Sequence, residues 1–258
     1  MGRIIIALLL FVALPAVAGD ERFDLHAVGV IDVAPDGSVH DYELETRLPP
    51  RVAGLVDQTV RGWKFHPILV DGRPVIATTR MRLVIEAVPG EDGYALRVAD
   101  VAFGEPERGA NAPPDYPIEA LRRGISAHVS LLLKVDASGK VSESHVERVD
   151  LSENLGKRGS AMRALFAKAS QAAAAGWTFE PGETVDGAPV DMRIRVPVDY
   201  TVQRASGWRE RPTLDPGPYM PPPWPVQVEA DTALAGNDLQ LLDPPRVTLR
   251  DDVIGSHL

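Results

Sequence analysis

The stretch LLKVDASGKV (Leu132–Val141) decides the fold, because it contains the end of a strand, a tight turn and the start of a returning strand. Apolar residues alternate along the chain up to Val135, which is typical of a strand with one buried face. Gly139 suits the positive φ that a hairpin turn requires. A related stretch, VIDVAPDGSV, occurs at Val30–Val39. We therefore expect the chain to hold two copies of one hairpin.

The same further segments follow each hairpin in the same order. Apolar residues first recur at helical spacing, and a Trp ends each helix. The first copy then reads GWKFHP (Gly62–Pro67) and DGRPV (Asp71–Val75), and the second reads GWTFEP (Gly176–Pro181) and DGAPV (Asp186–Val190). A last alternating strand completes each copy. The pattern predicts an α+β fold of two tandem small modules, each a short antiparallel sheet of about three strands packed against one or two helices.

The N-terminus, MGRIIIALLLFVALPAVA (Met1–Ala18), has the pattern of an export signal. Arg3 precedes the apolar run Ile4–Leu14, and Ala16-Val-Ala18 is a small-x-small cleavage site. A membrane-spanning helix needs roughly 20 apolar residues, so this run is short for an anchor. We predict cleavage after Ala18 and a periplasmic location. The alternative is an uncleaved anchor in the inner membrane.

The chain divides at changes in composition. We predict a signal peptide (1–18), a first module (22–90), a linker (91–111), a second module (112–204) and a Pro-rich C-terminal tail (205–258). The tail carries nine of the chain's 23 prolines, which favours extended polyproline II structure. It either docks a partner through Tyr219 and Trp224, or is a disordered or back-packed tail. We favour the second interpretation.

Composition narrows the class of function. The apolar content of 45% allows a packed core, and the net charge of −9 without a basic run argues against nucleic-acid binding. There is no cysteine, which excludes disulfides, thiolate metal sites and a cysteine nucleophile. The six histidines lack metal-ligand spacing, and no nucleophile elbow or phosphate loop is present. We predict no enzymatic activity, no metal and no cofactor.

The second copy resembles the TonB C-terminal domain family. Its motifs occur in the family's order: Tyr116-Pro117, the strand Val129–Val135, the turn Asp136–Gly139, Trp177-Thr-Phe179-Glu-Pro181 and Pro189-Val190. The first copy lacks the Tyr-Pro element and the first helix, so it resembles a degenerate version of the same module.

The resemblance implies a periplasmic protein that pairs by strand addition with an outer-membrane receptor or other envelope protein, in TonB-dependent transport. The partner-binding residues it suggests are Tyr116, Pro117, Asp191, Arg193 and Arg195. Inner-membrane motor proteins are expected as partners only if the N-terminus stays as an anchor. The anchor and the long Pro-rich spacer that force transmission requires are not evident in the sequence.

Each of these residues also has a structural interpretation. Trp63, Phe65, Trp177 and Phe179 are expected in the structural core rather than in a binding site. The Tyr116-Pro117 pair either stabilises the module or borders a partner groove. Arg193 and Arg195 are either a solvated face and a charged edge, or the edge that receives a partner strand. A second hypothesis for the whole chain is a structural tandem or homodimer in the envelope, with no receptor and no energy-transducing role.

Overall fold

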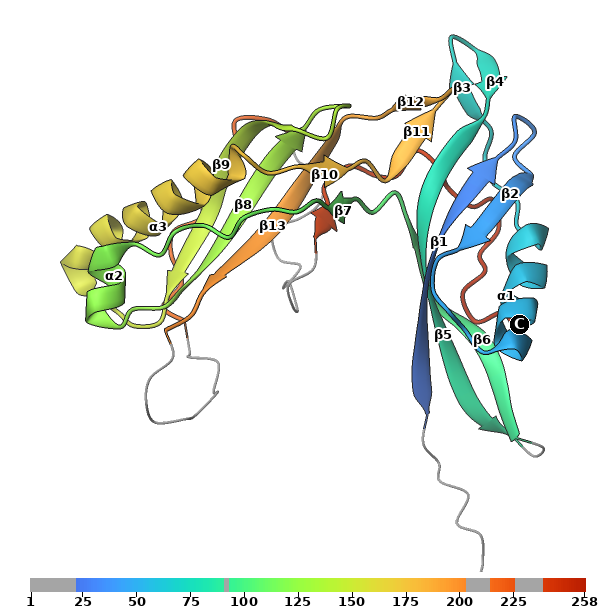
Figure 1. The fold of residues 1–258 in the computed structure, drawn as a ribbon, viewed down its shortest axis with the longest axis horizontal. Helices are drawn as coiled ribbons and strands as arrows, with labels where there is room; N and C mark the ends of the chain where they lie inside the picture. The colour runs from blue at the N-terminus through green and yellow to red at the C-terminus, as the bar shows by residue number, and fades with distance from the viewer. Residues whose placement is uncertain (1–21, 91–92, 203–213, 226–238) are drawn as a thin grey trace, which may run out of the picture.

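The computed structural model describes residues 22–90, 93–202, 214–225 and 239–258. The predicted signal peptide (1–18) lies outside these ranges. The described chain is α+β, with antiparallel sheets and a few helices, so the predicted fold class is confirmed. Two units lie side by side in Figure 1, and each is a sheet with helical structure on one face.

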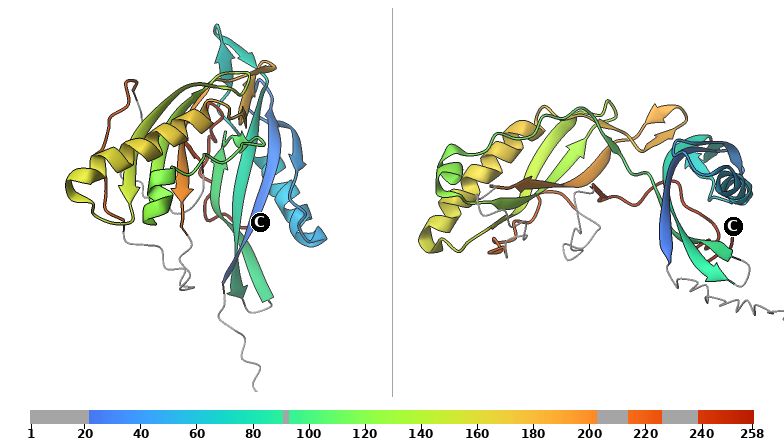
Figure 2. Two further views of the ribbon diagram at one scale, coloured as in Figure 1. Left: turned by 60° about the vertical axis from the view of Figure 1, so that its left-hand side comes forward. Right: turned by 60° about the horizontal axis from the view of Figure 1, so that its bottom comes forward.

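The second unit contains the hairpin that decides the fold. Its elements are α2 (Ile118–Arg123), β8 (Ala127–Val135), β9 (Val141–Leu151), the 3-10 turn η1 (Gly156–Arg158), α3 (Gly159–Ala174) and β13 (Met192–Tyr200). The strand order is β14-β13-β8-β9, with all neighbours antiparallel, and β14 (Gln240–Leu241) comes from the C-terminal tail. Helices α2 and α3 cover the same face (Figures 1 and 2), where Phe166 of α3 is fully buried.

The first unit repeats the order strand, strand, helix, strand. Its elements are β1 (Phe23–Val33), β2 (Val39–Leu44), α1 (Pro50–Gly62), the hairpin β3 (Ile68–Val70) and β4 (Arg73–Val75), and then β5 (Ala77–Gly90) and β6 (Gly93–Phe103). Strand β1 pairs with β2 on one side and with β5 on the other. Helix α1 buries Val56 and Val60 in the core of this unit.

The hairpin turn and the Trp-x-Phe segment meet in both units. Gly37 and Gly139 have φ angles of 84° and 80°. Each glycine carbonyl accepts a 2.8 Å hydrogen bond from the amide of a Phe, Phe65 in the first unit and Phe179 in the second. A Cβ atom at either glycine would lie 2.2 or 2.1 Å from the carbonyl oxygen of that Phe. Glycine is therefore required at both turns by the backbone angle and by this close approach.

The four aromatic residues that the sequence places in the core are buried. Their exposed fractions are 5% for Trp63, 0% for Phe65, 5% for Trp177 and 3% for Phe179. The indole Nε1 of Trp177 donates a 2.8 Å hydrogen bond to the carbonyl oxygen of Ala112. Burial with a satisfied indole N–H is the usual environment of a structural Trp.

The predicted linker (91–111) requires a correction. Its residues from Gly93 to Phe103 form β6, which pairs with β5 from Gly90↔Gly93 to Met81↔Phe103. Val98 and Phe103 are buried in the first unit's core. A register shift between Val84 and Ile85 interrupts the alternation of this pair, which hides the strand in the sequence pattern.

Short strands join the two units. The hairpin β11 (Glu183–Val185) and β12 (Ala188–Pro189) belongs to the second copy in sequence, but β11 pairs with β5 of the first unit. Strand β7 (Glu107–Arg108) pairs with β10 (Phe179–Glu180). Main-chain hydrogen bonds between β11 and β5 therefore join the second copy to the sheet of the first unit.

The described parts of the Pro-rich tail pack back on the protein. Residues 214–225 run along β9, where Asp215 exchanges two main-chain hydrogen bonds with Leu151. Residues 239–258 then run from the second unit to the first, as Figure 2 shows. There Val247 is fully buried in the core, and the Leu258 amide bonds the carbonyl of Leu96 in β6.

Candidate partner interface

The outer edge of β13 is the candidate interface that the sequence analysis proposed. The structure corrects the expectation that this edge is open, because the chain's own β14 pairs with it at Ile194↔Leu241 and Arg195↔Gln240. The Leu242 amide adds a 2.8 Å hydrogen bond to the carbonyl oxygen of Arg193. A partner strand would therefore meet an edge that is already partly occupied.

Arg193 fastens the tail to this edge. Its backbone N–H and its Nε both donate to Oδ2 of Asp243 at 3.1 Å, and Nη2 forms an ion pair with Oδ1. Its Nη1 donates to the carbonyl oxygen of Pro225. The hydrogen bond to the Asp243 carboxylate raises the pKa of the Arg193 guanidinium further above its usual range. Arg193 is thus a paired residue and not part of a solvated face.

Arg195 is buried, with an exposed fraction of 2%. Its guanidinium forms a two-point ion pair with Glu147, with Nε to Oε2 at 2.8 Å and Nη2 to Oε1 at 2.7 Å. Ser130 donates to Glu147 Oε2 at 2.7 Å, and Gln240 of the tail accepts from Arg195. The expectation of a solvated Arg195 is wrong, because the tail covers this face and the charge is neutralised locally.

A proline limits the rest of the β13 edge. The N–H and the C=O of Arg193 both point to the tail, on the outer edge of β13. Along an antiparallel strand, the main-chain groups of every second residue point to the same edge. Arg195 and Pro197 therefore also face outward. Pro197 has no N–H to donate, and proline inside a strand is typical of an edge that discourages pairing. Beside the two arginines, this proline is a signal in the sequence that indicates a restricted edge.

Trp224 covers the helix-free face of the second sheet. It is 8% exposed and packs with Leu132 and Leu242, which are fully buried. The Nζ of Lys134 lies 4.5 Å from the centre of the Trp224 ring system. The tail residue considered as an anchor for a partner is therefore used within the chain, whereas Tyr219 remains 50% exposed.

Tyr116 and Pro117 lie at the helical face of the second unit, beside the last residue of β13, Tyr200. The Tyr116 hydroxyl donates a 2.6 Å hydrogen bond to the carbonyl oxygen of Ile125, and its ring packs edge-on against Phe166 and Tyr200. Burial raises the pKa of Tyr116 above its usual range. Pro117 is the N-cap residue of α2. These contacts stabilise the start of the second unit and do not form a groove with Arg193.

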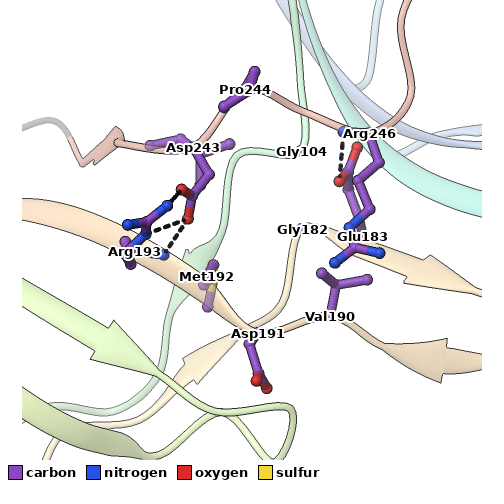
Figure 3. A pocket seen from close by; sticks show the side chains of 11 residues that line it. Gly104, Gly182, Glu183, Val190, Asp191, Met192, Arg193, Asp243, Pro244 and Arg246 are labelled. Carbon is purple, nitrogen blue, oxygen red and sulfur yellow. Dashed lines mark hydrogen bonds and ion pairs between the residues drawn. The ribbon is translucent and has the colours of Figure 1, made fainter. Parts of the chain in front are cut away.

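A cavity of about 290 Å3 lies where the two units and the tail meet. Figure 3 shows Arg193 and Asp243 facing each other on one side and Glu183 beside Arg246 on the other. Glu183 accepts hydrogen bonds from the backbone N–H groups of Arg246 at 3.0 Å and Val247 at 2.9 Å. Asp191, a predicted partner-binding residue, also lines this cavity. The charged groups here hold the tail in place.

Neither a metal site nor a spanning helix emerges from the described ranges. Within residues 22–90, 93–202, 214–225 and 239–258, no group of three His, Asp or Glu side chains could hold a metal ion. Of the helices in these same ranges, none is long and apolar enough to cross a membrane. What the arrangement offers is a sheet edge that binds an extended chain through its main-chain groups.

The second unit is a small antiparallel sheet under a long helix, and the outer side of its last strand, β13, pairs with the two-residue β14. Residues 112–202 match the family described as Gram-negative bacterial TonB protein C-terminal. Two proteins named Protein TonB, from two strains of Xanthomonas campestris pv. campestris, are each 33% identical to this chain over 90 residues. That match covers 35% of this chain and 35% of each relative, so the chain matches about a third of their length.

The solution NMR structure of Pseudomonas aeruginosa TonB CTD is 24% identical in sequence to this chain. The match covers 39% of this chain and 89% of the chain in that structure. Its TM-score is 0.29. Both the family model and the curated relatives thus relate residues 112–202 of this chain to the TonB C-terminal domain family. The predicted resemblance is confirmed for the second copy, whereas the first copy lies outside the matched residues.

Proposed function

We propose that this chain is a periplasmic TonB-like binding protein, acting in TonB-dependent transport. Its second unit would pair by strand addition with an extended segment of an outer-membrane receptor or another envelope protein. One observation carries the proposal: β13, the last strand of the family domain, already holds an extended segment, β14, along its outward main chain. An edge that pairs with the chain's own tail is competent for strand addition.

We also infer a division of labour between the units. The second unit would be the binding unit, and the first a degenerate copy that packs against it and holds the end of the tail. The shared turn and aromatic junction supports a common origin for the two units. We infer a binding role without catalysis, cofactor or metal, and inner-membrane motor proteins as partners only if the N-terminus remains an anchor.

Cross-linking tests the proposed partner. Because the chain has no cysteine, a single Cys in place of Asp199 on β13 can carry a photoactivatable maleimide. We expect it to capture an outer-membrane receptor in envelope preparations. The matched control is Cys in place of Arg123 on α2, because this helix covers one face of the sheet and does not lie along the outer edge of β13. Capture from α2 alone, or of no outer-membrane protein from β13, would contradict strand pairing at this edge.

Export is tested on the same preparation. Mass spectrometry of the mature chain is expected to give Gly19 as the first residue. Retention of Met1 in the inner-membrane fraction would instead restore the anchored version, with motor proteins as partners.

A second candidate function is a structural tandem or dimer in the envelope. It is favoured by the tail, which pairs with β9 and β13 of the second sheet and with β6 of the first. Light scattering of the purified chain separates the two candidates. A concentration-dependent dimer without any receptor cross-link would favour the structural role.

A further inference from the structure

We propose that the tail segment Leu239–Asp243 is an internal competitor for the β13 edge. In the resting chain it holds the main-chain groups that an external strand would use, and it must leave before such a strand can pair. This inference rests on the proposed function, because it concerns access to the same edge.

The main chain of the tail occupies the first half of the outer edge of β13. Leu242 donates to the carbonyl oxygen of Arg193, and β14 pairs with residues 194 and 195. Further along, the outward position is Pro197, which cannot donate. An incoming strand that pairs with the first half of β13 therefore has to use the positions at Arg193 and Arg195, where the tail already lies.

Side-chain contacts, called the seat contacts below, hold the segment in one position on β13. The Asp243 carboxylate accepts from the backbone N–H, the Nε and the Nη2 of Arg193. The Gln240 side chain accepts from Arg195, and Leu242 is fully buried against Leu132 and Trp224. These contacts fix the register of β14 against β13, as expected for a segment that binds this edge specifically.

The pairing is short enough to be displaced. Strand β14 has two residues, against nine in β13, which pairs along its whole length with β8 on its other side. Beyond the segment, the tail is fastened separately: Val247 is fully buried in the first unit, and the Arg250 amide bonds the carbonyl of Lys64. Release of β14 therefore leaves the tail tethered, at a high effective concentration for rebinding.

The test uses the tail's own sequence as the probe, a fluorescein-labelled LQLLDPPR peptide (Leu239–Arg246). In the release variant, Leu242→Asp with Asp243→Ala, the seat contacts are lost without a change in net charge. We expect this variant to bind the peptide at least about tenfold more tightly than the wild type, whose edge competes intramolecularly. Fluorescence anisotropy measures the affinity.

A matched control makes the same types of substitution at tail residues that do not contact β13. The variant Ile254→Asp with Asp251→Ala makes the same exchanges on exposed tail residues that lie on the first unit. It should bind the peptide as weakly as the wild type. A release variant with the wild-type thermal midpoint that binds the peptide no more tightly than this control would overturn the proposal.

A reversible lock provides the opposite state. The pair Ile194→Cys with Leu241→Cys joins directly opposite residues, in a chain without other cysteines. The oxidised form should bind no peptide, and reduction should restore the unlocked level. Peptide binding to the oxidised form equal to that of the reduced form would place the peptide elsewhere and contradict the proposal.

Hydrogen exchange on the wild type guards against a release variant that fails to fold. The Leu242 amide should exchange through local opening, much faster than the Ile194 amide, which faces β8. If both exchange only on global unfolding, the segment is a fixed part of the fold and the proposal fails. None of these measurements needs a receptor, so a missing receptor cross-link would contradict the proposed function alone.

Discussion

The same Arg–Glu pair occurs in both units, partly exposed in one and buried in the other. Arg80 of β5 is opposite Val30, and Arg195 of β13 is opposite Leu132, the corresponding residue of the second hairpin. Arg80 pairs with Glu45 at 2.9 Å, with side chains 20% and 42% exposed. Arg195 pairs with Glu147 at 2.7 Å, with side chains 3% and 7% exposed.

The difference comes from the tail and not from the pair itself. In the second unit Gln240 accepts from Arg195, and the neighbouring Trp224 and Leu242 are buried on the same sheet. In the first unit the pair stays near solvent and Arg80 also binds Glu107 at 2.7 Å. Corresponding Arg–Glu pairs thus lie in two different electrostatic environments. The segment that covers a charged strand residue therefore decides how much its ion pair contributes to stability.

Breaking the buried pair should have the largest effect. We expect Glu147→Ala to lower the free energy of unfolding by about 3–5 kcal/mol, because it leaves the Arg195 charge buried without a carboxylate. Urea denaturation measures the change. The counterpart Glu45→Ala removes an exposed pair and should cost at most about 1 kcal/mol. Equal losses for the two variants would mean that burial does not distinguish the pairs.

The two turns should respond alike, in contrast to the two ion pairs. We expect Gly37→Ala and Gly139→Ala each to cost about 1–3 kcal/mol, because both positions combine a positive φ with a carbonyl oxygen in the place of the new Cβ. Thermal unfolding of each variant provides the comparison. Gly54→Ala should stabilise instead, because Gly54 lies in the interior of α1 and, apart from the adjoining helix backbone, nothing lies within 4 Å of the added Cβ.

The first unit should depend on the tail for its core. Val247→Ala removes buried methyl groups and is expected to cost about 2 kcal/mol. Ile254→Ala, at a 57% exposed position of the same tail, should change stability by no more than about 0.5 kcal/mol. A Val247 variant as stable as the Ile254 variant would show that the first unit does not need this segment.

The smallest expected effect concerns Tyr42 of β2, whose buried hydroxyl has no hydrogen-bond partner within the described residues. Burial raises the pKa of Tyr42 from 10.0 to about 12. The folded state therefore keeps the proton that the unfolded state loses above pH 10, so stability falls as the pH rises from 10 to 12. Tyr42→Phe should remove part of this fall. Melting temperatures across that range test it, and unchanged pH dependence would contradict the assignment.

Much of the repeat can be predicted from the sequence because its signals are local. The Asp-x-x-Gly turn, the helical apolar stripe and the Trp-x-Phe segment each lie within one element, and they locate the hairpins, helices and buried aromatics. Strand β6 was missed because its extra residue Ala99, between the pairs Ile85↔Val98 and Val84↔Asp100, interrupts the alternation of its apolar residues. Glu147 and Asp243 were missed because nothing near them in the sequence indicates the arginines that they bind.

By itself, then, the sequence determined an α+β fold, a segment with TonB-like motifs and the face on which each strand buries its apolar residues. Only the tertiary structure decided that β13 is an occupied edge, that Arg195 is buried and that β11 joins the sheet of the first unit. The reason is physical. Side-chain alternation specifies which residues share a face, whereas the cover of that face, and the pairing of an edge, depend on where a distant part of the chain returns.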